Sequence, residues 1–279
     1  MNIVLVCIDN FQDYILTNIK QLIRLEHTNI HIITNKRFES YFSIYFGKIK
    51  LYFVENEEND SFQFHYKCEL TDDFKEGFWK LTSYRFFIIY EIMQKYNITN
   101  VIHLENDVLI YYNCDIISDK FDSKYIYLPF DSFERNIASI MYIPTYEILG
   151  DVLKEYDCNI NDMQNFRNIQ LKTNIIHHFP IFVTSSINTE FQFVTQNYDI
   201  FKMIFDAAAI GQFLGGVDPK NDPSNTVGFI NETCIIKYNN YTIFWKNIDD
   251  VNKPFLVYEG IEIPIFNLHI HCKNLEKFI

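Results

Sequence analysis

Residues 101–111 read VIHLENDVLIY, and this stretch shows how the chain is built. Val101–Leu104 is apolar and typical of a short buried strand, and two carboxylates, Glu105 and Asp107, follow it. Alternate residues of a strand share a face, so both carboxylates are expected to point the same way. Ligand sites of α/β sheets lie beyond the carboxyl ends of parallel strands. The spacing therefore favours a site for a divalent cation bound to phosphates, or equally an acidic junction that only faces solvent.

The preceding hundred residues alternate between strand and helix signals. β-Branched apolar runs predict strands at Ile3–Ile8, Ile30–Thr34 and Ile49–Val54. Apolar residues at helical spacing predict helices over Phe11–Leu25, Phe38–Phe46 and Phe74–Tyr96. This order favours an α/β fold with a parallel sheet and helices on its faces.

After about residue 120 the pattern changes to shorter elements. We expect strands at Tyr125–Leu128, Ala138–Ile143, Gly228–Tyr238, Tyr241–Trp245 and Ile265–Cys272, and helices at Thr145–Tyr156 and Asp206–Leu214. The asparagine-rich stretch 158–173 is interpreted as a polar connection. Because no repeat or linker divides the chain, we expect one domain of two lobes, with a nucleotide held by residues 1–120 and the rest of the site shaped by residues 121–279.

Composition excludes several classes of function. The 279 residues carry a formal net charge of −12, whereas nucleic acids and anionic membranes are bound by basic surfaces. No stretch reaches the roughly 18 apolar residues of a membrane helix, so no span is expected. The six cysteines form no C-x-x-C pair, and residues 1–8 are interpreted as an opening strand rather than a signal peptide. These features predict reduced thiols and a cytoplasmic location.

Residues 266–273, FNLHIHCK, carry a second polar pattern. On one strand, Asn267, His269, His271 and Lys273 would share a face. Two imidazoles and an ammonium suit a metal ion and an anion, although exposed histidines are the simpler interpretation of this strand alone.

Two further residues attract attention. Arg85, in an aromatic helix, is expected to pair with an acidic group or to face a phosphate. Asp206 stands at the start of a predicted helix, where an N-cap role needs no further function. The small residues that follow it, Ala207–Ala209 and Gly211, indicate close approach of backbone or of a ligand.

The chain resembles GT-A fold glycosyltransferases of the glycogenin and bacterial galactosyltransferase type. In that family a helix with an arginine, here Ser83-Tyr84-Arg85, precedes a strand that ends in D-x-D, here the variant Glu105-Asn106-Asp107. The family's last strand carries a metal-binding histidine and a lysine six residues later, as His271 and Lys277 are spaced, but its glycine and closing Pro-Trp are missing here. Residues 136–143, NIASIMYI, and Phe205-Asp206 are similar to its pocket strand and its sugar-contacting segment.

The resemblance implies a GT-A-like, Rossmann-type mixed sheet and a site for Mn²⁺ or Mg²⁺. Asp107 and His271 would converge on the ion, with Glu105 and His269 as further candidate ligands. The expected contacts to a nucleotide-sugar are Cys7, Asp9, Thr34, Asn35, Arg85, Glu105, Asn106, Lys273 and Lys277. The expected sugar-contacting or catalytic carboxylates are Asp206, Asp218 and Glu232.

The implied function is transfer of a sugar from a nucleotide-sugar, such as a UDP-sugar, to a hydroxyl of a glycan, protein or small molecule. A degenerate carbohydrate-binding domain is the main alternative. A sugar nucleotidyltransferase is disfavoured because CIDNFQDY, after the first strand, offers neither glycine nor lysine for a phosphate loop. A metal hydrolase using the C-terminal H-x-H is a distant third.

Overall fold

A seven-stranded, mostly parallel sheet forms the centre of the structure, a computed structural model that describes residues 1–57, 60–71, 73, 77–183, 193–215 and 234–279. The strand order is β10-β6-β9-β4-β1-β2-β3. Its strands are β1 (Asn2–Cys7), β2 (Ile30–Thr34), β3 (Ile49–Phe53), β4 (Val101–Leu104), β6 (Ile126–Leu128), β9 (Ile140–Ile143) and β10 (Ile176–His178). Strands β1 to β4 are mutually parallel, and β9 runs antiparallel to β4 and β6. The predicted α/β class, with its four neighbouring parallel strands, is confirmed.

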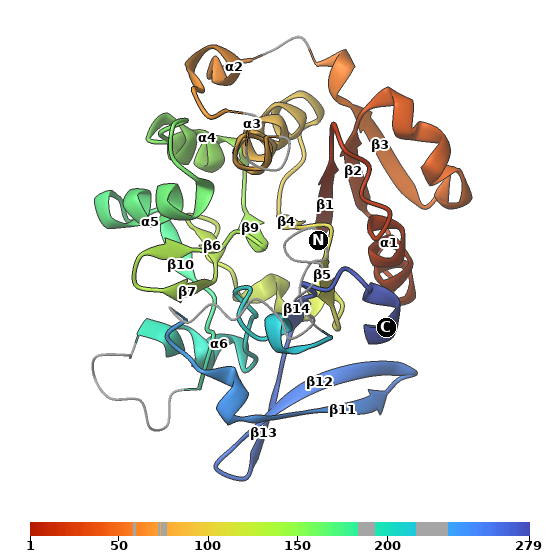
Figure 1. Ribbon diagram of the computed structural model, residues 1–279, viewed down its shortest axis with the longest axis vertical. Helices are drawn as coiled ribbons and strands as arrows, with labels where there is room; N and C mark the ends of the chain where they lie inside the picture. The colour runs from red at the N-terminus through yellow and green to blue at the C-terminus, as the bar shows by residue number, and fades with distance from the viewer. Residues whose placement is uncertain (58–59, 72, 74–76, 184–192, 216–233) are drawn as a thin grey trace.

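Alternation along β1 divides the core into two faces. Ile3 and Leu5 pack with α1 (Ile15–Arg24) and the 3₁₀ segment η1 (Lys36–Tyr45), whereas Val4 packs on the opposite face. That opposite face is covered by α3 (Phe78–Tyr96), α4 (Tyr146–Lys154) and α5 (Asp162–Lys172). Figure 1 shows α1 on one side of the sheet and α3 to α5 on the other.

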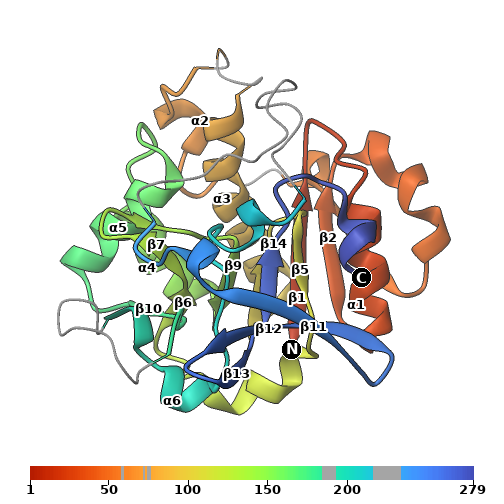
Figure 2. The same cartoon turned by 60° about the horizontal axis from the view of Figure 1, so that its bottom comes forward.

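A second layer of short strands lies beyond the carboxyl end of β4. Strand β5 (Val108–Ile110) pairs antiparallel with β14 (Asn267–His269). A separate meander contains β11 (Thr242–Ile248), β12 (Val251–Tyr258) and β13 (Ile261–Pro264), which cross the front of the molecule in Figure 2. Both pack on a third apolar core, so the C-terminal part of the chain returns to the acidic junction after β4.

Helix α5 is the main element that the sequence analysis missed. Its N-cap, Asn161, accepts a hydrogen bond from the backbone N–H of Gln164 at 3.0 Å, and Phe166 and Ile169 bury its inner face. An N-cap followed by apolar residues three apart is a helix signal that the asparagine-rich composition of 158–173 obscured. Among the described residues, no helix has both the length and the apolar character needed to cross a bilayer.

Other expected elements differ in detail. The helix predicted over Phe38–Phe46 is a 3₁₀ segment. The helix predicted over Phe74–Tyr96 begins at Phe78, after Gly77 with a left-handed φ of 82°, and residues 74–76 lie outside the described part. Most of the predicted strand Gly228–Tyr238 also lies outside it, and residues 234–238 form no strand.

The helix predicted over Asp206–Leu214 is wrong. Only Gly211–Phe213 forms a 3₁₀ turn, and Ala208 has a left-handed φ of 58° that interrupts helical geometry. The carboxylate of Asp206 takes the N–H groups that a helix would give to its own carbonyls.

We predict that Gly211→Ala destabilises the fold. A Cβ at Gly211 would lie 1.6 Å from the carbonyl oxygen of His269, so loop and strand would have to separate. The free energy of unfolding, measured in urea, should fall by about 3 kcal/mol or more. Gly47→Ala is the control: no atom of the described residues lies within 4 Å of the position that its Cβ would take, so only the φ of 86° should cost stability, about 1 kcal/mol. Equal losses in both variants would contradict the close packing.

Candidate functional site

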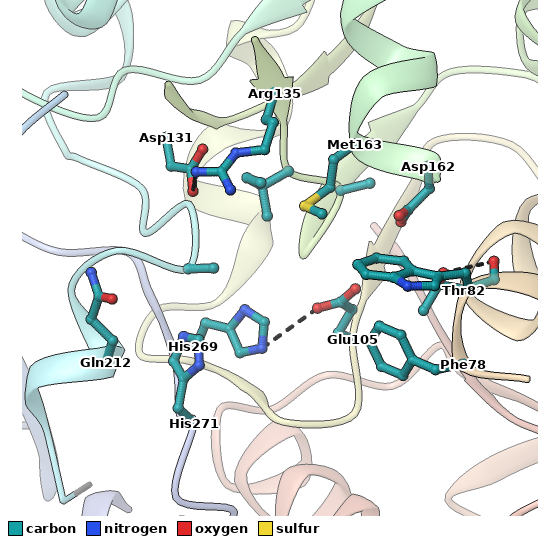
Figure 3. A pocket seen from close by; sticks show the side chains of 14 residues that line it. Phe78, Thr82, Glu105, Asp131, Arg135, Asp162, Met163, Gln212, His269 and His271 are labelled. Carbon is teal, nitrogen blue, oxygen red and sulfur yellow. Dashed lines mark hydrogen bonds and ion pairs between the residues drawn. The ribbon is translucent and has the colours of Figure 1, made fainter. Parts of the chain in front are cut away.

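Two short strands bring predicted carboxylates and an imidazole together. Val108 of β5 lies opposite His269 of β14, directly after the carboxylates of Glu105 and Asp107. His269 Nε2 lies 2.9 Å from Asp107 Oδ2, across 162 positions of sequence, and 3.6 Å from Glu105 Oε2. Figure 3 shows the ring of His269 directed at Glu105. Backbone pairing thus sets the imidazole against both acids.

The backbone beyond β14 decides which histidine contacts Asp107. β14 ends at His269, and a turn closed by Lys273 N and Ile270 O, 3.1 Å apart, follows. The imidazole that contacts Asp107 is that of His269, and metal binding by His271 stays a prediction. The ring of His271 stacks on that of His269 with centroids 4.6 Å apart, and its Nε2 has no hydrogen-bond partner in the described part of the chain. Burial lowers the pKa of His271 to about 3, so the ring is neutral.

Glu105, Asp107 and His269 fit a divalent cation. One ligand atom from each lies within 4.8 Å of the others. That spacing suits atoms that share an ion at about 2–2.3 Å each. A mixed carboxylate and imidazole set suits Mn²⁺ among the ions that also bind phosphate oxygens. The donor atoms are thus sufficient in kind and position for a metal site.

Neighbouring charges control the ionisation of these acids. Burial alone would raise the pKa of Asp107, but His269 and Lys273 hold it well below its usual range. Burial likewise raises the pKa of Glu105, and Arg85 and His269 outweigh it, so that the net shift is downward. Both side chains are therefore carboxylates at neutral pH, the form that binds a cation.

Arg85 is buried and lies between two carboxylates. Its Nη1 donates to Glu105 Oε1, and its Nη2 lies 2.8 Å from Asp162 Oδ2. Of the two alternatives stated for this arginine, the structure shows the acidic partner rather than a free guanidinium facing a phosphate. Asp162, in the first turn of α5, was not singled out from the sequence because its helix was missed.

Glu105, Asp162 and His269 help to line a cavity of about 200 Å³. Figure 3 shows Glu105 and His269 on one side, Met163 and Asp162 above, and Phe78 beside Glu105. The cavity is lined by Phe78, Trp79, Thr82, Glu105, Asp131, Arg135, Ile137, Ala138, Asp162, Met163, Ala208, Gln212, His269 and His271. It combines an anionic wall with an aromatic and apolar one, as expected for a binding site.

A second ion pair in the cavity was not anticipated. Arg135 Nη2 lies 3.0 Å from Asp131 Oδ2, on the hairpin of β7 (Phe130–Ser132) and β8 (Arg135–Asn136). Burial raises the pKa of Asp131 to about 6, although Arg135 opposes that shift. Nothing in its local sequence distinguishes Asp131 from other acidic turn residues; only the fold brings it to the cavity.

The expected nucleotide contacts at the first two strands do lie together. Thr34 Oγ1 donates to the carbonyl of Cys7 at 2.7 Å, and the N–H of Asp9 donates to Asn35 Oδ1 at 2.6 Å. Asn106 Nδ2 donates to the carbonyl of Val6 in β1 at 2.7 Å, which joins this group to the acidic junction. Contact of these residues with a base or ribose remains a prediction.

The remaining expected site residues are placed differently. Asp206 is fully buried, and its two oxygens accept hydrogen bonds from the backbone N–H groups of Ala209, Ile210, Gly211 and His269. Lys277 is exposed in the 3₁₀ segment Leu275–Phe278, and Lys273 contacts Asp107 Oδ2. Asp218 and Glu232 lie outside the described residues.

No family model and no curated protein matches the chain. Among solved structures, it is similar to an active-site mutant of LgtC, with 13% identity and a TM-score of 0.49 over 75% of this chain and 85% of that one. It is also similar to mouse xyloside xylosyltransferase 1, with 11% identity and a TM-score of 0.46 over 72% and 92% of the two chains. A cytidylyltransferase from Leptospira borgpetersenii gives 11% identity and a TM-score of 0.35 over 64% and 75%. Because each TM-score is below 0.5, the choice of activity rests on the site geometry.

We predict that Asp206→Asn acts on stability. The Asn side chain would place its NH₂ group against backbone N–H groups that now donate hydrogen bonds to the carboxylate. Urea unfolding should show a loss of about 2 kcal/mol or more. Asp199→Asn, at a side chain that is 76% exposed, is the control and should change little. Unchanged stability together with lost turnover would instead return Asp206 to the catalytic residues.

Asp131 should titrate near pH 6. Its pKa of about 6 lies above the ordinary 3.8, so the folded protein favours the protonated acid. As pH rises from about 4 to 6 the unfolded chain loses this proton first, which lowers stability by about 2–3 kcal/mol. A carboxyl ¹³C NMR titration should show a midpoint near 6 that is absent in Asp131→Asn. A midpoint at or below 4 would contradict the burial argument.

Proposed function

We propose that the chain is a metal-dependent glycosyltransferase that moves a sugar from a nucleotide-sugar, such as a UDP-sugar, to an acceptor hydroxyl. The observation that carries the proposal is the convergence of Glu105, Asp107 and His269 beside a cavity at the carboxyl end of β4. This is the edge of a parallel sheet where nucleotides bind. The acceptor class, whether glycan, protein or small molecule, is open.

Asp107 and His269 would hold Mn²⁺ or Mg²⁺, with Glu105 as a third ligand. Such an ion supplies a Lewis acid that neutralises charge on a departing diphosphate. Arg85 occupies one oxygen of Glu105 and leaves the other, Oε2, on the side of His269. The arginine would therefore orient the carboxylate of Glu105, and its contact with a phosphate stays a prediction.

Other residues of the cavity suit a sugar. Asp131 and Arg135 offer an acceptor and donors for hydroxyl groups, and Asp162 offers a second carboxylate. Phe78 and Trp79 supply aromatic surface that keeps water from the reacting bond. The lobe of residues 1–120 would bind the nucleotide near Asn35, and residues 121–279 would bind the sugar and acceptor.

Asp107→Asn should separate this proposal from its alternatives. Loss of a carboxylate ligand should weaken Mn²⁺-dependent binding of a nucleoside diphosphate by about a thousandfold, because several kcal/mol of electrostatic stabilisation are lost. Calorimetric titration with and without Mn²⁺ measures the effect. The control is Asp119→Asn, at an exposed residue of the 3₁₀ segment Cys114–Lys120.

Products distinguish the activities. Slow hydrolysis of a nucleotide-sugar to a nucleoside diphosphate and free sugar supports glycosyl transfer. Formation of a nucleotide-sugar from a sugar 1-phosphate and a nucleoside triphosphate would indicate a nucleotidyltransferase. Binding without turnover of any nucleotide-sugar would indicate a degenerate binding domain. Full Mn²⁺-dependent activity in Asp107→Asn would refute the proposed site.

A further inference from the structure

Lys273 lies against the acidic cluster, at the side chain of Asp107. Its Nζ contacts Asp107 Oδ2, the same oxygen that lies 2.9 Å from His269 Nε2. The oxygen of Asp107 that faces the imidazole of the candidate metal cluster is therefore already paired with the chain's own ammonium group. An ammonium and a divalent cation repel each other at this separation, so each disfavours the other on this oxygen.

Hydrogen bonds hold the backbone around Lys273, and its side chain is partly exposed. The N–H of Ile270 donates to the carbonyl of Asp107 at 2.9 Å, and the N–H of Lys273 closes the turn on the carbonyl of Ile270 at 3.1 Å. Lys273 itself takes a left-handed φ of 58°, a conformation that non-glycine residues adopt at a cost. Its side chain remains 23% exposed, and its ammonium lies 5.7 Å from the ring centroid of Tyr14. A fixed turn thus holds a long, rotatable side chain at the edge of the cluster.

The charges around the cluster are consistent with exchange of the Lys273 ammonium for a divalent cation. Three carboxylates, those of Glu105, Asp107 and Asp162, are faced by the permanent cations of Arg85 and Lys273. Arg85 is committed to two of the acids in a buried position. Lys273 is the partly exposed cation of the two, and the one whose withdrawal would open Asp107 to a metal ion.

We propose that Lys273 is a tethered counter-ion of Asp107 that a divalent cation must displace. The inference rests on the proposed function, because it assumes that the cluster binds a metal ion. Once displaced, the ammonium would stay beside the site, where an anionic phosphate group would stabilise it in its new position. Metal and nucleoside diphosphate would then favour each other's binding partly through Lys273, as linkage requires.

The test is Mn²⁺ binding to the full chain without nucleotide, measured by the EPR signal of free Mn²⁺. Lys273→Met should bind Mn²⁺ about ten- to a hundredfold more tightly than the wild type, the usual worth of a charge-assisted hydrogen bond. Lys273→Arg keeps the counter-ion and should resemble the wild type. Lys20→Met removes an exposed ion pair with Glu276 beside the same C-terminal segment and should also leave Mn²⁺ binding unchanged.

A second measurement adds saturating UDP. The gain in Mn²⁺ affinity of Lys273→Met should shrink or reverse, because the variant also lacks the ammonium that would face the diphosphate. A merely structural role for Lys273 would instead weaken Mn²⁺ binding under both conditions. If Lys273→Met does not fold, as judged by circular dichroism, Lys273→Gln carries the same expectation.

The outcomes separate this inference from the proposed function. If the wild type binds Mn²⁺ and Lys273→Met binds it equally or more weakly, the counter-ion role of Lys273 is overturned. The proposed metal site then stands. Failure of the wild type and every variant to bind Mn²⁺, with or without UDP, overturns both the counter-ion and the metal-dependent function.

Discussion

The arrangement of the cavity depends on one buried guanidinium. Arg85 comes from α3 and binds Glu105, which follows β4, and Asp162, which begins α5. Three elements far apart in sequence therefore meet at this group. Removing one member of a buried ion group leaves an uncompensated charge, typically at a cost of about 3–5 kcal/mol. Because well-packed apolar side chains could give equal stability, the value of the arginine lies in the orientation that it imposes on Glu105.

Backbone groups hold the other half of the cluster. Asp206 accepts the N–H of His269 together with three N–H groups of its own loop, and Gly211 packs against the carbonyl of His269. On the other side, β14 pairs with β5 next to Asp107. The backbone that carries the imidazole is thus held by the loop on one side and by strand β5 on the other. Such support limits reorganisation when a ligand binds, which is the usual requirement of a preorganised site.

Local sequence patterns were sufficient for the sheet and not for the cavity. β-Branched runs at strand length predicted β1 to β4 and their parallel order, and topology then placed Glu105 and Asp107 at the functional edge of the sheet. What failed were features set by tertiary contacts. The turn after His269 breaks an alternation that looked continuous, and the bonds of the Asp206 carboxylate replace a helix that the small residues favoured. Asp162 and Asp131 could not be found from the sequence because their places depend on distant parts of the chain. Helix α5 brings Asp162 to 2.8 Å from Arg85, 77 positions away. A hairpin without a special sequence pattern carries Asp131 to the cavity.

The electrostatics around the cavity also bear on the proposal that a chain of net charge −12 binds an anion. Its cations are already engaged, since Arg85, Arg135 and Lys273 each contact a carboxylate. An anion that arrives alone would meet those carboxylates and would have to compete with them for every positive group. Under the proposed function, an anion that arrives with a divalent cation would bring a positive charge to Glu105 and Asp107 and would release Lys273 for itself. The proposed site would then be complementary to a metal–anion pair rather than to either ion separately, which favours a diphosphate over a simple anion as the proposed ligand.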